Sequence, residues 1–208
     1  MPTPSAITLR DLAFEWPDGT VALANVNGTF PTGLIGRNGT GKSTLLEHLV
    51  NGTAPLPDRP HGRLLTERVG YLPQRLDGLD EDASAMENVR AVAPDTPQGT
   101  VRNQLARLLL RGAAADRPVR TPSGGERFRV SLARLLLAQP PAHLLVLDEP
   151  TNNLDIVSVE QLVEALDAYR GALLVVSHDA GFLDRIGVDT VIALDPDGRM
   201  RQRRDLSA

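Results

Sequence analysis

The sequence contains no cysteine, which excludes disulfide bonds and thiolate metal sites and fits a reducing compartment. It also lacks any apolar run near the ~20 residues that a membrane-spanning helix requires. The longest such run, residues 132–138, is interrupted by Arg134. Residues 1–6 lack the basic region and apolar stretch of a signal peptide. These absences lead us to expect a cytoplasmic protein without an intrinsic membrane segment.

An excess of charge of one sign is also missing. The net charge is −4 over 208 residues, so the chain as a whole is not a polybasic nucleic-acid binder. Hydrophobic residues make up 41% and charged residues 23%, which is an ordinary balance for a soluble domain. The length suits one domain with a substantial core.

A glycine-rich loop at residues 36–43 fits the phosphate-binding pattern G-x-x-x-x-G-K-[ST]. Its glycines let backbone N–H groups point inward without a Cβ in the way. Lys42 can place a positive charge on the β- and γ-phosphates, and the Ser43 hydroxyl is available to Mg²⁺. The apolar pair before the loop and the helical run after it favour this interpretation over an ordinary glycine-rich turn. The predicted nucleotide-binding residues here are Gly36, Arg37, Asn38, Gly39, Thr40, Gly41, Lys42, Ser43 and Thr44.

Two adjacent carboxylates end an apolar run at residues 144–150. Asp148 closes a predicted buried strand, where a carboxylate is costly unless a cation or water meets it, and Mg²⁺ is the natural partner. Glu149 is next in the chain and can polarise an attacking water. An ordinary strand-to-turn junction would also explain two acids, but the phosphate loop in the same chain favours a site that binds a nucleoside triphosphate with Mg²⁺ and hydrolyses it.

Residues 123–126, Ser-Gly-Gly-Glu, precede a predicted helix. They make a second anion-binding helix N-terminus, although a simple helix cap explains the tetrapeptide equally well. Because the phosphate loop already holds one triphosphate, a second cradle suggests another use.

Apolar strands alternate with helices along the chain, which predicts an α/β core. Residues 51–62 are rich in proline and glycine and should form a loop, and the basic tail 199–204 should be frayed. The expected strands are 7–14 and 21–30, which form a hairpin, and 34–35, 69–72, 144–147, 172–176 and 190–194. The expected helices are 44–50, 83–92, 101–110, 126–138, 156–169 and 180–186.

In their order along nearly the whole chain, these motifs resemble the ATP-binding cassette (ABC) ATPases. The resemblance rests on residues 36–43, Gln74, 123–126, 144–150, 153–155 and 177–179. It implies an ABC-type P-loop NTPase fold in one nucleotide-binding domain, 1–208. That fold has a mostly parallel core sheet, an N-terminal antiparallel β-subdomain and a helical subdomain at about 76–139. It also implies ATPase activity with ATP and Mg²⁺.

The resemblance further implies a head-to-tail dimer with two ATP molecules in its interface. Each phosphate loop is then closed by Ser123, Gly124 and Gly125 of the other cassette, with Glu126 beside them. The resemblance assigns γ-phosphate sensing to Gln74 and the switch histidine to His178, and it makes Asp155 a link between the two sites. The implied catalytic residues are Lys42, Glu149 and His178, and the implied Mg²⁺ residues are Ser43, Gln74 and Asp148.

Trp16 stands where the family has an aromatic residue that stacks on adenine, and packing of a hairpin aromatic on the sheet is the alternative. Two departures from the family pattern stand out. Pro122 replaces the usual leucine before Ser-Gly-Gly, which would alter how that loop meets the partner's ATP. The segment 31–36 is also shorter than the family's usual segment before the phosphate loop. The strand that leads into the loop would therefore be brief, or residues are missing there.

Residues 123–127, 150–155 and 177–184 resemble the ABC-F proteins, which are soluble tandem-cassette ATPases. Many of these act on ribosomes, and some confer antibiotic resistance. Only one cassette is present, so the chain resembles half of a tandem protein or a stand-alone relative. The alternatives are the ATP-binding subunit of a membrane transporter and a regulatory module with little turnover. Residues 76–99 are acidic, and residues 74–123 are proline-rich with few aromatics, which disfavours the pocket by which transporter ATPases grip their membrane subunits.

Overall fold

The computed structural model describes residues 8–15, 21–29, 32–36, 42–51, 66–120, 124–152, 154–188, 190–194 and 200–203. The chain forms two compact units. The first unit comprises residues 1–71, 143–150 and 170–208, and the second comprises 72–142 and 151–169. No helix in the described ranges is long and apolar enough to cross a membrane.

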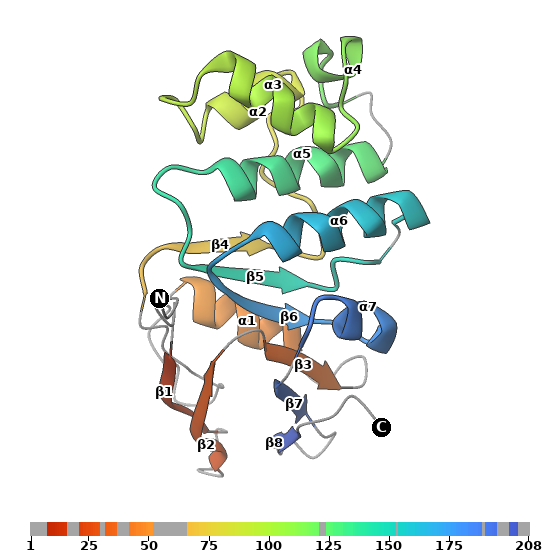
Figure 1. Ribbon diagram of the computed structural model, residues 1–208. Coiled ribbons are helices and arrows are strands. Elements are labelled where there is room, and N and C mark those ends of the chain that lie inside the picture. Colours follow the sequence, from red (N-terminus) through yellow and green to blue (C-terminus); the bar gives the residue numbers. More distant parts are fainter. Residues whose placement is uncertain are drawn as a thin grey trace, which may run out of the picture. The chain divides into compact units, whose positions relative to one another are not determined.

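The first unit begins with an antiparallel pair of strands, β1 (Thr8–Glu15) and β2 (Val21–Thr29), shown in Figure 1. Thr8 lies opposite Thr29, and Glu15 lies opposite Val21. This pairing confirms the predicted hairpin. The pair forms a sheet of its own, as expected for an N-terminal antiparallel β-subdomain.

The core of the first unit is a six-stranded sheet with the order β4-β5-β6-β3-β7-β8. Its strands are β3 (Thr32–Gly36), β4 (Val69–Leu72), β5 (Leu144–Asp148), β6 (Ala172–Val176), β7 (Thr190–Leu194) and β8 (Met200–Arg203). β3 runs parallel to both of its neighbours, β5 runs parallel to β6, and β8 runs antiparallel to β7. The sheet is therefore mostly parallel, as predicted.

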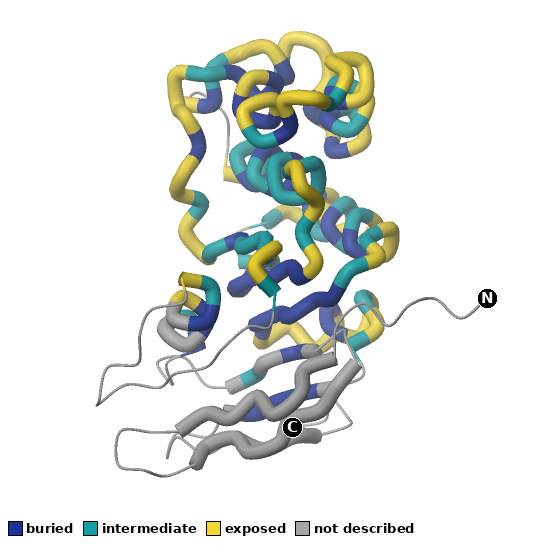
Figure 2. Tube along the Cα trace, turned by 90° about the vertical axis from the view of Figure 1, so that its left-hand side faces the viewer, coloured by how far each residue is buried: buried dark blue, intermediate teal, exposed yellow. Residues whose placement is uncertain are grey.

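Every residue of β5 and β6 is buried (Figure 2). Both strands consist of apolar residues, except for the terminal Asp148, because a parallel strand covered on both faces has no polar side to show to water. Helices α1 (Lys42–Asn51) and α7 (Ala180–Arg185) belong to the same unit. α1 buries Leu46 and Leu49, three residues apart on one helix face.

The strand register brings three chain segments to one edge of the sheet. Asp148 is paired with Val176, and Leu34 is also paired with Val176. The residues that follow β3, β5 and β6 therefore leave the sheet at the same carboxyl-terminal edge. Ligand sites of open α/β sheets are built at this edge.

The second unit is helical. Its helices are α2 (Ala85–Arg90), α3 (Gln98–Arg107), α4 (Ala113–Asp116), α5 (Gly124–Leu137) and α6 (Ile156–Ala168). α2 contacts α3, α4 and α5, and α5 contacts α6. A capping box starts α2, because the Glu87 N–H donates to Ser84 Oγ at 3.2 Å and the Ser84 N–H donates to Glu87 Oε2 at 2.7 Å.

The structure corrects three sequence-based expectations. The basic tail is not frayed over 200–203, because its backbone pairs with β7 as strand β8. The four-residue helix α4 was not predicted, since an alanine-rich turn this short has no periodicity to detect. β3 extends over five residues rather than the two expected. Most of the predicted loop 51–62 lies outside the described residues, and the helical subdomain at about 76–139 stays a proposal.

Candidate functional site

The phosphate loop leads into α1, whose first residue is Lys42. Gly36 is the last residue of β3, so the loop connects a central strand to a helix N-terminus, which is the arrangement that binds phosphate. Lys42 is buried at 7% exposure and Ser43 is half-buried. Residues 37–41 lie outside the described residues, and Thr44 is placed only as part of α1.

Asp148, at the end of β5, is 2% exposed. Its carboxylate accepts a hydrogen bond from the Ser43 side chain, while its Oδ1 has no solvent contact and no partner among the described residues. Burial and the nearby Glu149 raise the pKa of Asp148 above its ordinary value, against the lowering effects of the Ser43 hydrogen bond and the Lys42 charge. A buried carboxylate with one orphaned oxygen is the state that a bound cation relieves.

These residues fit Mg²⁺. The Ser43 hydroxyl and the Asp148 carboxylate are hard oxygen donors, and Mg²⁺ usually takes only one or two protein ligands together with waters and substrate phosphates. The described residues contain no cluster of three or more His, Asp or Glu side chains that could hold a metal ion. Bound there, the ion would neutralise charge on the β- and γ-phosphates.

Glu149 has an unusual backbone conformation, with φ of 48°. Positive φ is uncommon for residues other than glycine, and strained backbone conformations cluster at active sites, although Leu109 also has a positive φ. The conformation is held by a hydrogen bond from the Glu149 N–H to the Val176 carbonyl at 2.8 Å. This backbone turn takes Glu149 out of the strand direction while its side chain stays only 7% exposed.

His178 follows β6 and meets Glu149. The distance from His178 Nδ1 to Glu149 Oε2 is 2.8 Å. In this hydrogen bond the ring nitrogen Nδ1 donates to the carboxylate oxygen, and the His178 side chain is 60% exposed. The loop is fixed on both sides of His178, because the Ser177 hydroxyl is buried and accepts from the Asp179 N–H at 3.1 Å.

A second group of predicted residues lies in the helical unit. α5 begins at Gly124, and Glu126 in its first turn pairs with Arg117 at 2.6 Å. Asp155 caps α6 by accepting from the Ser158 N–H at 2.7 Å. That bond lowers the pKa of Asp155. The cap role of Asp155 was not foreseen from the sequence.

The remaining predicted residues are placed less fully. Trp16 and Ser123 lie outside the described residues. Gln74 is exposed just after β4 and belongs to the second unit, so the structure does not place it relative to Asp148. The structure therefore brings five predicted residues together in one unit, and they are Lys42, Ser43, Asp148, Glu149 and His178.

Two residues near Asp148 were missed in the sequence. Glu47 lies one turn after Ser43 on α1, and its negative charge helps to raise the pKa of Asp148. Tyr71 on β4 is half-buried, and its pKa is raised by burial and by the charges of Asp148 and Glu47. The spacing of four residues between Ser43 and Glu47 was the available signal, since such residues share a helix face.

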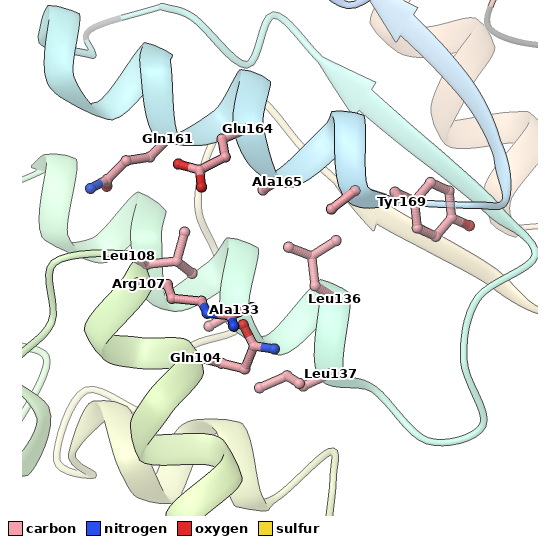
Figure 3. A pocket seen from close by; sticks show the side chains of 11 residues that line it. Gln104, Arg107, Leu108, Ala133, Leu136, Leu137, Gln161, Glu164, Ala165 and Tyr169 are labelled. Carbon is pink, nitrogen blue, oxygen red and sulfur yellow. The ribbon is translucent and has the colours of Figure 1, made fainter.

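A pocket of about 260 Å³ opens in the helical unit and contains none of the predicted site residues. Figure 3 shows its walls, which come from α3, α5 and α6. Leu108, Leu136 and Leu137 line it together with three alanines, while Gln161 and Glu164 approach from α6. Its lining is mostly apolar, and Arg107 and Glu164 are its charged residues.

Comparison with known proteins places this geometry in a family. A family model described as "ABC transporter" matches residues 24–152. Residues of this chain are 37% identical over 151 positions to human "ATP-binding cassette sub-family F member 3", covering 72% of this chain and 21% of that protein. They are 41% identical over 155 positions to "ATP-binding protein Uup" of Escherichia coli, covering 73% of this chain and 24% of that protein.

"ABC transporter F family member 3" of Arabidopsis thaliana is 33% identical over 196 positions, covering 90% of this chain and 27% of that protein. The chain thus spans about a quarter of the length of the curated relatives it matches. Among solved structures, a dimeric bacterial ABC transporter cassette is similar with a TM-score of 0.72 at 21% identity, covering 97% of this chain and 99% of that one. This structural likeness shows the fold.

Proposed function

The chain belongs to the ATP-binding cassette (ABC) family and is an ABC ATPase cassette most like the ABC-F proteins, and from this premise we propose that its first unit binds Mg²⁺-ATP and hydrolyses it to ADP and phosphate. One observation carries the proposal. The sheet brings the buried cation Lys42, the paired Ser43 and Asp148, and the hydrogen-bonded Glu149 and His178 to one carboxyl-terminal edge. Charge, metal ligands and a positioned base are the parts that phosphoryl transfer requires.

In this proposal each side chain has one task. Lys42 and the N-terminus of α1 bind the β- and γ-phosphates. Glu149 accepts a proton from the attacking water. The oxygen of that water forms a bond to the γ-phosphorus, and the bond between the γ-phosphorus and the bridging oxygen of ADP breaks. His178 holds the Glu149 carboxylate through Nδ1, which leaves Nε2 to contact the γ-phosphate. Ser43 and Asp148 hold Mg²⁺.

We also propose that a second cassette completes the site, with Ser123, Gly124 and Gly125 facing the partner's ATP. Two features of the helical unit support this. The first turns of α5 and α6 lie against each other, since a Cβ on Gly125 would be 3.8 Å from Asp155 Oδ2. The residues after Asp155, Ile156 and Val157, are 79% and 49% exposed. An exposed apolar pair beside a predicted interface residue fits burial by a partner.

For the biological role, we propose an ABC-F-like ATPase that acts on ribosomes in translation or antibiotic resistance. The names of two relatives place them in sub-family F, which supports the ABC-F part of this proposal. The described surface supports it too, because the only exposed large apolar side chain between residues 72 and 120 is Leu109. Arginine–carboxylate pairs occupy that surface instead, among them Arg120 with Asp82 and Arg127 with Glu81.

The test of the enzymatic proposal is Glu149→Gln, with Glu160→Gln on the exposed face of α6 as the matched control. Glutamine keeps the size and hydrogen-bonding ability of the side chain but cannot act as a carboxylate base. We expect ATP binding near that of the natural chain and a hydrolysis rate lower by roughly 100-fold or more. Unchanged turnover in Glu149→Gln would refute Glu149 as the base.

The role is tested by sedimentation of the Glu149→Gln chain, loaded with Mg²⁺-ATP, with purified ribosomes and separately with membrane vesicles. Retention on ribosomes that disappears with Mg²⁺-ADP supports the ABC-F reading. Binding to vesicles that contain the cell's membrane proteins, without binding to ribosomes, would support the transporter reading instead.

A further inference from the structure

Arg129 lies one turn into α5 and faces the residues that start α6. Its Nε donates to the carbonyl of Gly125 at 3.1 Å. Its Nη2 would lie 3.7 Å from a Cβ placed on Gly125. The guanidinium therefore reaches back along the helix to the first turn, next to the glycine pair that the sequence marks as an anion cradle.

The same glycine faces the cap of α6. A Cβ on Gly125 would lie 3.4 Å from Ser158 Oγ and 3.8 Å from Asp155 Oδ2. Four residues thus share one small region, and we call Gly125, Arg129, Asp155 and Ser158 the α5–α6 bracket. All four belong to the same compact unit.

Charge connects the members of this bracket. The Asp155 carboxylate is held mainly by Ser158, and the Arg129 charge also stabilises its ionised form. Ser158 is fully buried, and its Oγ has no hydrogen-bond partner among the described residues. Arg129 is half-buried, so its charge acts on Asp155 with less screening than a surface charge would.

We propose that Arg129 is a positioning residue that holds the first turn of α5 and the Asp155 cap at a fixed spacing, so that both meet the second cassette's ATP site as one preformed surface. This inference rests on the proposed function. Its physical basis is that one planar guanidinium bonds to the Gly125 carbonyl through Nε, while its Nη2 and Asp155 Oδ2 both lie within 4 Å of the position of a Cβ on Gly125. A surface formed before the partner arrives loses less entropy when the dimer closes.

The test uses Arg129→Gln and Arg129→Lys in a Glu149→Gln background, with Arg127→Gln as the matched control. Arg127 lies on the same helix, but its guanidinium pairs with Glu81 at 2.9 Å, outside the bracket. Two quantities are measured, which are Mg²⁺-ATP affinity at a protein concentration where the chain is monomeric, and the dimer dissociation constant with Mg²⁺-ATP by sedimentation.

For Arg129→Gln we expect monomer ATP affinity within about twofold of the parent and a dimer dissociation constant raised about tenfold, the size of one coupled charged contact. The dimer dissociation constant of Arg129→Lys should lie between those of the parent and of Arg129→Gln, because lysine keeps the charge but lacks the planar guanidinium. Arg127→Gln should change neither quantity. A double-mutant cycle of Arg129→Gln with Asp155→Asn should be non-additive, and the cycle with Arg127→Gln should be additive.

The outcomes separate the two proposals. If the Glu149→Gln chain itself does not dimerise with Mg²⁺-ATP, the proposed composite site fails and the role of Arg129 fails with it. If that chain dimerises and Arg129→Gln dimerises equally well, the role of Arg129 alone is overturned. If Arg129→Gln does not fold, as judged by its circular dichroism, the result for Arg129→Lys decides in the same way.

Discussion

Asp148 shows at the scale of one residue how a functional site works against stability. Its folded-state pKa is raised, so in the ligand-free chain its ionisation disfavours the folded state. The protonated Asp148 contributes stability to the folded state, and this contribution is fully present below the unfolded pKa of about 4. It is lost as the pH rises through the folded pKa. A neutral side chain of the same size should avoid that loss.

We therefore predict that Asp148→Asn raises the melting temperature of the nucleotide-free chain by roughly 2–5 °C at pH 8. The gain should shrink at pH 4, where the natural carboxyl is protonated too. Mg²⁺-dependent ATP binding should weaken in the same variant, since a carboxylate ligand is gone. Thermal unfolding followed by circular dichroism at both pH values checks this, with Asp184→Asn on α7 as the exposed control. An equal gain at both pH values would contradict the linkage.

Lys42 is the only lysine in the 208 residues, and it is buried where α1 begins. We predict that Lys42→Ala weakens ATP binding by about 2–5 kcal/mol, because buried charge partners lose about that much when one side is removed. Isothermal titration measures the affinity, and Lys42→Arg serves as the charge-keeping control.

A second readout uses the same residue. ATP should protect the Lys42 amine from reductive methylation in the natural chain, while the N-terminal amine serves as internal reference. Methylation at the same rate with and without saturating Mg²⁺-ATP would argue that the amine does not contact the phosphates.

At the scale of elements, the packing of the helical unit has a local defect. The pocket between α3, α5 and α6 is lined by Ala165 on α6, whereas Ala115 on α4 is fully buried and does not line it. We predict that Ala165→Leu fills part of the pocket and raises the free energy of unfolding by about 0.5–1 kcal/mol. Ala115→Leu should instead lower it by about 1–3 kcal/mol through overpacking.

Urea unfolding of both variants provides the comparison. Since neither alanine belongs to the predicted nucleotide site, ATP hydrolysis should stay within a factor of two for Ala165→Leu. A loss of stability on filling the pocket would mean that the cavity is needed for the arrangement of the three helices.

At the scale of the whole molecule, the proposed site is shared between two cassettes. We predict that the specific ATPase activity of this chain rises with protein concentration, because in the proposed dimer each phosphate loop is completed by Ser123, Gly124 and Gly125 of another molecule. The measurement is turnover per molecule over a hundredfold range of concentration. A flat profile with the protein monomeric throughout would contradict a composite site.

Mixing two inactive variants gives a sharper form of the same prediction. Lys42→Ala disables the phosphate loop and leaves 123–125 intact, while Ser123→Arg does the reverse. A mixture should regain at most one working site per mixed pair, and each variant alone should stay inactive. No recovery at any ratio, with both variants folded, would count against sharing.

The sequence by itself determined the order of the motifs, the α/β alternation and most elements. The strand predicted at 172–176 is β6 with the same limits, and the strand at 69–72 is β4. These features depend on residues that are neighbours in the chain, such as an apolar run or a helix face, so their physical cause is local. The phosphate loop and the pair Asp148–Glu149 could be singled out for the same reason.

Only the tertiary structure decided which polar groups meet. The contact of Glu149 with His178 joins residues 29 positions apart, and it depends on β5 and β6 being neighbours in register. The dimer role of Asp155 stays a prediction, whereas the fold shows that Asp155 caps α6 beside Gly125. The tail that was expected to be frayed forms strand β8 over residues 200–203, because its backbone pairs with the edge of β7. A hydrogen bond between distant segments leaves no local pattern, since its partner is chosen by the packing of the whole sheet.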